Sequence, residues 1–332
     1  MKKRFRLALF ILAAPLVILL AGSLFFQASA FYHQKDEASA SAPKNGQFIS
    51  LGKENIYVQE LGPLEGPALL FIHGTGSWSE LWKPTMKMLS ELGFRCIAVD
   101  LPPFGFSFAD SDSQMKFDRT TQAQRIIALL DKLNVQKVTL VGHSFGGRAT
   151  LTTALLIPDR IERLILIDIA LGFGDQKNMS SPAPAPQWLS FVLNNEFSLS
   201  TLASIGTYPP LTRKFVEMFV ANPTSVTDDI NKMYQTPLSV KGKNALMGGW
   251  LKDFLLSEDN ELVQNQNLFQ KISAPTYLIW GDLDTVTPFW QGEEIKNRFK
   301  NSQLHMMKNV GHIPMIEDQD AFQKLIRTIL VP

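Results

Sequence analysis

The sequence predicts an α/β protein with a mostly parallel, doubly wound sheet, a helical lid insertion and an N-terminal transmembrane helix. Three observations lead to this fold class. Short apolar runs alternate with segments of helical periodicity, which is typical of parallel strands covered by helices on both faces. One long stretch interrupts this alternation without a clear strand. An uncharged apolar run lies near the N-terminus, directly after a basic cluster.

The strands are expected where apolar residues follow one another or alternate. Residues 47–51 and 55–60 indicate an opening hairpin, and the run Ala-Leu-Leu-Phe-Ile at 68–72 indicates a strand buried on both faces. Further strands are expected at 95–100, 138–142, 163–169, 275–280 and 302–307. Helices are expected at 120–133, 146–157, about 288–299 and 317–329. Strands and helices in this order predict a single, mostly parallel sheet.

The interrupting stretch covers residues 172–262 and contains a proline-rich segment at 181–186. Amphipathic pieces rich in aromatic and methionine residues follow it. We expect this stretch to form a helical lid inserted between two strands. Its apolar side chains either form a substrate pocket or only bury small helices against the body, and the sequence leaves both interpretations open.

The N-terminus carries a membrane signal. Residues 7–26 contain no charged side chain, and four of the first six residues are Lys or Arg. At 1.5 Å per residue, a helix over this run reaches about 30 Å, the thickness of a hydrocarbon layer. The basic residues are expected to stay in the cytoplasm, which places the remaining chain on the extracytoplasmic side of a single-pass membrane protein.

A cleaved signal peptide is the competing interpretation, because Ala28-Ser29-Ala30 resembles a cleavage site. The product would then be secreted or periplasmic. The apolar run exceeds the roughly 7–15 residues of most signal peptides, which favours an uncleaved anchor. Residues 33–46 are polar, with Ser, Ala, Pro and Gly, and indicate a tether, which we place at 27–46.

Composition excludes several classes of protein. Of 332 residues, 45% are hydrophobic and 19% charged, which suits a large buried core. The net charge of +1 gives no sign of a nucleic-acid partner. The single cysteine, Cys96, excludes an intramolecular disulfide, and no cluster has the spacing of a metal site, so neither metal nor cofactor is expected. The chain is therefore divided into six segments: a cytoplasmic basic tail (1–6), an anchor (7–26), a tether (27–46), a first core part (47–171), a lid (172–262) and a second core part (263–332).

The strongest local signal is Gly142-His143-Ser144-Phe145-Gly146, which follows an apolar strand and precedes a helix. It fits the G-x-S-x-G pattern in the strand–turn–helix context of a nucleophile elbow. A sharp turn lifts the serine hydroxyl clear of the sheet edge, and the glycines leave room for the crowded backbone. We therefore predict that Ser144 is a nucleophile rather than a surface serine in a glycine-rich turn.

Beside the elbow, four segments give the chain a resemblance to the α/β-hydrolase superfamily from about residue 47 onward. His73–Gly76 matches its oxyanion loop, and Asp100–Ser107 matches its D-x-x-G-x-G-x-S loop. Trp280–Asp284 matches its acid loop, and Gly311–Pro314 matches its histidine loop. The order serine, acid, histidine is also shared. The second segment departs from the pattern because Phe106 stands between Gly105 and Ser107. The resemblance implies the α/β-hydrolase fold.

A serine hydroxyl needs a neighbouring base, and that base needs an orienting carboxylate. His312 is the predicted base because it stands in a Gly/Pro loop after an apolar strand. His73 is its rival, although the resemblance implies a structural role for that histidine. The side chain of His143 is expected to point away from Ser144. Of the other two histidines, His305 falls in an expected strand and His33 in the expected tether.

The orienting acid has several candidates. Asp284 stands where the G-x-x-D pattern of the resembling superfamily places its acid, so it is preferred. Asp282 could be the orienter or a turn residue. Asp168 ends the strand before the lid, a location that some relatives use. Asp100 is expected to hydrogen-bond a neighbouring loop.

The oxyanion hole is predicted to combine the backbone N–H of Phe145 with that of Thr75, or alternatively Gly76. Backbone donors impose no side-chain identity, so this prediction rests on loop position alone.

The predicted activity is hydrolysis of a small or medium apolar ester through an acyl-enzyme on Ser144, with His312 as base and Asp284 as its orienter. Thioester, amide and carbon–carbon bond hydrolysis in the same fold stay open. The alternative from another class is a catalytically silent, membrane-tethered ligand-binding protein. The presence of all three residues argues against it. Neither the natural substrate nor the oligomeric state follows from the sequence.

Overall fold

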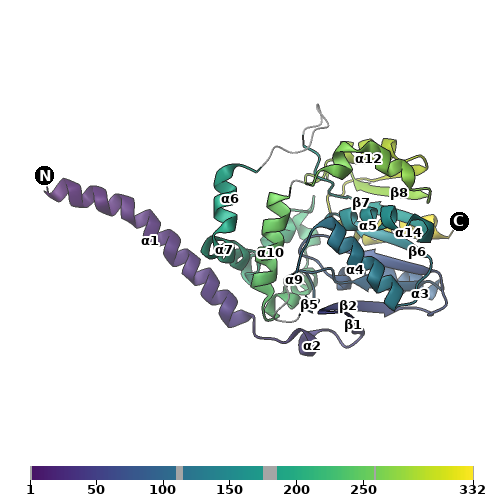
Figure 1. Ribbon diagram of the computed structural model, residues 1–332, viewed down its shortest axis with the longest axis horizontal. Coiled ribbons are helices and arrows are strands. Elements are labelled where there is room, and N and C mark those ends of the chain that lie inside the picture. Colours follow the sequence, from purple (N-terminus) through teal and green to yellow (C-terminus); the bar gives the residue numbers. More distant parts are fainter. Residues whose placement is uncertain (1, 110–114, 175–184, 258, 332) are drawn as a thin grey trace.

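A nine-stranded sheet forms the centre of the protein (Figure 1). The computed structural model describes residues 2–109, 115–174, 185–257 and 259–331, with side chains from Val17 onward. The strand order is β1-β2-β4-β3-β6-β7-β8-β9, and β5 pairs with β2. The strands are β1 (Gly46–Leu51), β2 (Glu54–Leu61), β3 (Ala68–Ile72), β4 (Arg95–Val99), β5 (Phe108–Ala109), β6 (Val138–His143), β7 (Ile161–Ile167), β8 (Thr276–Gly281) and β9 (Ser302–Met307).

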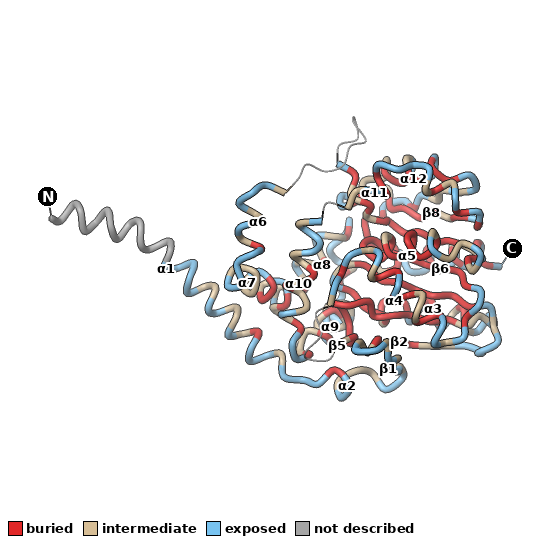
Figure 2. The backbone as a smooth tube through the Cα atoms, in the orientation of Figure 1, coloured by how far each residue is buried: buried red, intermediate tan, exposed pale blue. Residues whose placement is uncertain are grey.

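Strands β3, β4 and β6 to β9 run parallel, and β1 and β2 form the antiparallel hairpin at one end. Alternate side chains of β3 enter opposite layers of the core. Leu70 and Ile72 pack with α4 (Arg119–Lys132), α5 (Phe145–Leu156) and α12 (Trp290–Arg298). Leu69 and Phe71 pack with α3 (Lys83–Glu91) and α14 (Gln319–Leu330). Figure 2 shows the resulting band of buried residues along the strands. The predicted doubly wound, mostly parallel sheet is confirmed.

The core strands and helices expected from the sequence are present, each within two residues of its expected bounds. Helix α3 and strand β5 were not expected. Helix α3 is short and buries Thr85, Met86 and Leu89 between exposed lysines, and β5 has only two residues, too few for a periodic pattern. Both elements become visible only through their contacts with the sheet.

A helical insertion separates β7 from β8 and lies between α1 and the sheet in Figure 1. Residues 175–184, which include most of the proline-rich segment, lie outside the described residues. The insertion's elements are α6 (Gln187–Asn194), α7 (Glu196–Gly206), η3 (Pro209–Leu211), α8 (Thr212–Glu217), η4 (Pro223–Ser225), α9 (Asp228–Gln235), η5 (Thr236–Ser239), α10 (Lys243–Leu256), α11 (Glu261–Gln264) and η6 (Gln266–Lys271).

Helix α1 (Lys2–His33) is continuous and extends away from the body (Figure 1). Its C-terminal end contacts the insertion, because Gln27 Nε2 donates to Thr201 Oγ1 at 2.9 Å and the Phe26 ring lies 5.3 Å from that of Tyr208. Within the part of the chain that is described, no helix is both long and apolar enough to cross a membrane. Residues 7–16 of the predicted span lie outside the residues whose side chains are described.

The prediction that residues 27–46 form a tether needs correction, because this segment is attached to the insertion. Helix α1 continues to His33, and a second short helix, α2 (Ala38–Ser41), follows. Asp36 N donates to Ser239 O at 3.1 Å, and Lys241 N donates to Asp36 O at 2.8 Å. These backbone partners lie about two hundred residues further along the chain, so composition alone could not reveal them.

Candidate active site

Ser144 occupies the turn between β6 and α5, at the carboxyl end of the parallel strands. Its φ of +51° lies in the left-handed region, which is strained for a residue with a side chain. A Cβ at Gly142 would collide with Thr150 Oγ1, and one at Gly146 would collide with the carbonyl oxygen of His73. Glycine is therefore required on both sides of the serine.

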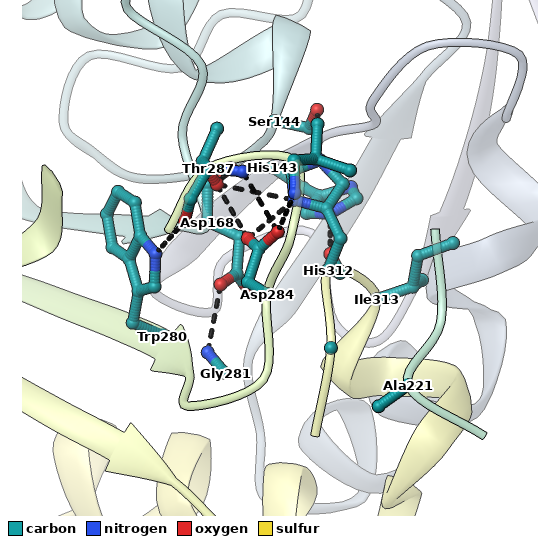
Figure 3. Close-up of polar contacts among 12 residues, drawn as sticks. His143, Ser144, Asp168, Ala221, Trp280, Gly281, Asp284, Thr287, His312 and Ile313 are labelled. Atoms are coloured by element: carbon teal, nitrogen blue, oxygen red, sulfur yellow. Dashed lines mark hydrogen bonds and ion pairs between the residues drawn. The ribbon is translucent and has the colours of Figure 1, made fainter. Parts of the chain in front are cut away.

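The structure joins the side chains of Ser144, His312 and Asp284 into one chain of hydrogen bonds (Figure 3). His312 Nε2 lies 2.7 Å from Ser144 Oγ, and His312 Nδ1 lies 2.7 Å from Asp284 Oδ2. The three residues follow β6, β9 and β8, whose carboxyl ends meet at one edge of the sheet. All three are at least 94% buried, so water hardly competes for these bonds.

Asp284 is held in its ionised form. Its Oδ1 accepts from the N–H groups of Val286 (2.7 Å) and Thr287 (2.9 Å), and its Oδ2 accepts from Thr287 Oγ1 (2.6 Å). Burial acts to raise the pKa of Asp284, but the hydrogen bonds and charge from His312, together with Thr287, hold it below its usual value of 3.8. Because a carboxylate only accepts, His312 Nδ1 carries the hydrogen, and Nε2 is left to accept from Ser144.

Asp168, the rival acid, lies directly beside Asp284 (Figure 3). Its Oδ1 accepts from Gly281 N at 2.9 Å, while its buried Oδ2 has no hydrogen-bond partner among the described residues. Burial, followed by the charge of Asp284, raises the pKa of Asp168 well above its usual value. Asp168 therefore keeps its proton to a higher pH than Asp284, and Asp284 is the one that bonds His312.

The other histidines have different partners. His73 donates from Nδ1 to Gly74 O (2.8 Å) and accepts at Nε2 from Leu101 N (3.0 Å), and burial lowers its pKa to about 4. His143 was expected to point away from Ser144. It instead lines the same cavity as Ser144, and its Nε2 donates to the carbonyl oxygen of His312 at 2.7 Å. Burial lowers the pKa of His143 to about 3, so it acts as a neutral support of that loop. Of the remaining two, His305 lies in β9 and His33 is the last residue of α1.

The other aspartates organise loops. Asp282 Oδ1 accepts from Val310 N at 3.3 Å. Asp100 accepts from Ser79 N and Phe106 N, each at 2.7 Å, and burial raises its pKa to about 6. The hydrogen bonds expected between Asp100 and a neighbouring loop are thus present.

The predicted oxyanion donors lie near the serine. Phe145 is the first residue of α5, so its N–H has no acceptor inside the helix. Thr75 and Gly76 line the same cavity as Ser144. Their role toward an oxyanion stays a prediction.

A cavity of about 340 Å³ opens beside Ser144, between the core loops and the insertion. Most of its lining is apolar, and the insertion supplies much of it. The aromatic and sulfur-containing members of the lining are Phe104, Phe215, Met218, Phe219, Tyr234 and Met247.

Among the described residues, Asp168, Asp284 and His312 lie close enough to hold a metal ion, with one ligand atom of each within 4.8 Å of the others. The hydrogen bond between His312 and Asp284 already accounts for their closeness.

Comparison with known proteins identifies the family to which the chain belongs. The model of the family described as "alpha/beta hydrolase fold" matches residues 67–319. The chain belongs to the α/β-hydrolase fold family. It is 27% identical over 287 residues to a 2-hydroxy-6-oxononadienedioate/2-hydroxy-6-oxononatrienedioate hydrolase of Pseudomonas putida. The aligned region covers 83% of this chain and 92% of the relative.

Two solved structures show the same fold as this α/β hydrolase. An esterase from Exiguobacterium antarcticum has a TM-score of 0.69 at 22% identity, covering 86% of this chain and 100% of the esterase. A membrane phospholipase A, described as a bacterial virulence factor, has a TM-score of 0.63 at 23% identity, covering 99% of this chain and 98% of the phospholipase. Identities this low speak for the fold alone.

Three contributors to this α/β-hydrolase site were not predicted from the sequence. Thr287 bonds Asp284 through both its N–H and its hydroxyl, a local pattern that aspartate turns commonly show and that could have been recognised. His143 supports the histidine loop, and Glu317 accepts hydrogen bonds around His312. The last two act on residues that meet them only in the folded chain, so no local sequence pattern indicates their roles.

Asp168→Asn should stabilise this α/β hydrolase above pH 4, because asparagine keeps the acceptor for Gly281 N without an acid to ionise. The raised pKa means that the folded protein retains a proton that the unfolded chain releases. The free energy of unfolding therefore falls as pH rises from about 4 toward the folded pKa, by about 1.4 kcal/mol per pH unit.

Thermal unfolding of both proteins between pH 4 and pH 8 measures this effect. The melting temperature of the variant should rise relative to wild type as pH increases. A difference that is independent of pH would contradict the raised pKa of Asp168.

Proposed function

We propose that this α/β hydrolase is a serine hydrolase that cleaves neutral, apolar acyl esters. The observation that carries the proposal is the hydrogen-bonded chain from Ser144 through His312 to Asp284. An ionised Asp284 fixes the imidazole with its Nε2 toward the hydroxyl, which is the arrangement that activates a serine.

The proposed reaction has two halves. Ser144 Oγ attacks the ester carbonyl while His312 Nε2 takes the hydroxyl proton, and the backbone N–H groups of Phe145 and Thr75 stabilise the oxyanion. The C–O bond to the alcohol breaks as His312 returns the proton to the leaving oxygen. Water, deprotonated by His312, then attacks the acyl-enzyme, and the acid leaves as Ser144 regains its proton.

The charge of the cavity supports a neutral substrate. Among the described residues that line it, Lys243 alone carries a formal charge. Its Nζ already donates to the carbonyl oxygens of Pro103 (2.9 Å) and Gly105 (2.6 Å). Burial lowers its pKa to about 8, and the Asp100 charge acts against that shift. A substrate carboxylate in this cavity would lack a free cation and would lose its water.

Hydrolysis of a carbon–carbon bond is the second candidate, favoured by the Pseudomonas putida relative. The name of that relative's substrate contains two carboxylates, and the described residues that line the cavity offer no free cation for either. The esterase and the phospholipase A with the same fold carry the names of ester-cleaving enzymes, which agrees with the first candidate. A silent ligand-binding protein would not need the complete chain of hydrogen bonds.

We also propose that α1 attaches the enzyme to a membrane and that the insertion serves as a lid. The uncharged run 7–26 and the basic residues before it support a single crossing, with residues after the run on the extracytoplasmic side. Cleavage near Ala30 would instead release the hydrolase.

Substrate preference tests the proposed function. Nitrophenyl esters of one acyl length, with and without a terminal carboxylate, differ only in charge. The neutral ester should have a kcat/KM at least about tenfold higher, because an unpaired carboxylate costs more than about 1.4 kcal/mol in an apolar cavity.

The same assay includes matched histidine variants. His312→Ala should abolish turnover of both esters, whereas His305→Ala, on β9, should change neither. Equal rates on both esters, or faster hydrolysis of an oxononadienedioate, would show that the assigned substrate class is wrong.

Membrane orientation can be tested with a reporter enzyme that is active only outside the cytoplasm, fused after Pro332. The fusion should be active and should sediment with membranes in alkaline carbonate. Activity confined to the cytoplasm would contradict the orientation, and a soluble extracytoplasmic product would indicate cleavage.

A further inference from the structure

The carboxylate of Glu317, at the end of α13 (Pro314–Glu317), gathers N–H groups from three places. Gly311 N lies 3.0 Å from both carboxylate oxygens, and Ile313 N lies 3.2 Å from Oε1. Ala221 N, from the insertion, lies 2.7 Å from Oε2. Two of these donors flank His312 directly, and the third belongs to a segment about ninety residues earlier in the chain.

The backbone of residue 311, the insertion and the Glu317 carboxylate are packed closely together. A Cβ at Gly311 would lie 2.5 Å from Ala221 N and 3.0 Å from Glu317 Oε1, so the insertion and the carboxylate both need a glycine there. Hydrogen bonds to an ionised acceptor are stronger than those between neutral groups. Glutamine has the same shape, but only one of its two terminal atoms can accept.

The backbone of His312 has its own partners. Its N–H donates to Phe219 O at 2.9 Å, and its carbonyl accepts from His143 Nε2 at 2.7 Å. The bond from His312 N to Phe219 O and the bond from Ala221 N to Glu317 Oε2 therefore join this part of the chain to residues 219–221 of the insertion, one in each direction. Figure 3 shows Ala221 beside Ile313, on the far side of the loop from Asp284.

We propose that Glu317 is a positioning residue for His312 and that it couples this base to residues 219–221 of the insertion, here called the cavity wall because Phe219 lines the cavity. The inference rests on the proposed function, because it treats His312 as the base. Phe219 lines the cavity, and its ring lies 5.8 Å from the imidazole. A shift of this wall would therefore move the base away from Ser144.

A helix cap alone does not explain these contacts. Ile313 is the N-cap residue of α13, so its bond to Glu317 resembles a reciprocal cap. The bonds from Gly311 and from Ala221 are not part of such a cap. They restrain the loop before the base and the wall beside it, and the described hydrogen bonds of Glu317 include none to Ser144 or Asp284.

Kinetics of Glu317→Gln and Glu317→Ala in the full chain test the positioning role. Both variants should lower kcat on the neutral nitrophenyl ester by about 10- to 100-fold with KM within about twofold, because displacement of a catalytic group by about 1 Å has costs of this size. The control is Asp318→Ala, which removes the neighbouring cap of α14, where Asp318 Oδ1 accepts from Ala321 N at 3.0 Å. It should lower the melting temperature and leave kcat unchanged.

Hydrogen exchange gives a readout that does not depend on turnover. In Glu317→Gln, amide protection should fall together at 311–313 and at 219–221, and in Asp318→Ala it should fall at neither. Unchanged kcat in the Glu317 variants, or protection lost at 311–313 alone, would overturn the proposal. If wild type hydrolyses no ester, the proposed function fails by itself, and the exchange pattern still decides whether Glu317 couples the two segments.

Discussion

The 2.7 Å hydrogen bond between Ser144 Oγ and His312 Nε2 is the contact on which the rest of the site depends. It joins residues 168 positions apart, and it can form because parallel strands bring their carboxyl ends to one edge. The left-handed turn presents the hydroxyl there, and Asp284 leaves Nε2 as the acceptor. Without any one of these conditions the serine would be an ordinary, weakly nucleophilic alcohol.

Two neighbouring carboxyl groups show how environment assigns different roles to the same side chain. Asp284 accepts hydrogen bonds from two backbone N–H groups, from a hydroxyl and from the imidazole, and its pKa is lowered. Asp168 accepts one bond, from Gly281 N, and its pKa is raised. Both residues are at least 96% buried, so burial acts to raise both pKa values, and the additional donors around Asp284 offset this effect there. Asp284 therefore ionises at a lower pH than the neighbouring Asp168.

Much of this could be predicted from the sequence because the signals are local. The apolar run 68–72 gives a strand with those same bounds, and the elbow around Ser144 carries its own steric requirement for glycine. The attachment of residues 27–46 to the insertion could not be predicted, since it depends on backbone partners far along the chain. The same holds for Glu317, whose three donors meet only after the insertion has folded against the histidine loop.

Covalent labelling by a fluorophosphonate tests the central claim most directly, because it requires an activated hydroxyl and no knowledge of the substrate. Mass spectrometry of the labelled protein should find one adduct, on Ser144. The adduct should be absent in Ser144→Ala and retained in Ser77→Ala, which alters another serine of the same cavity. Folded wild-type protein that stays unlabelled, or a label on a different residue, would contradict the assignment of Ser144 as the nucleophile.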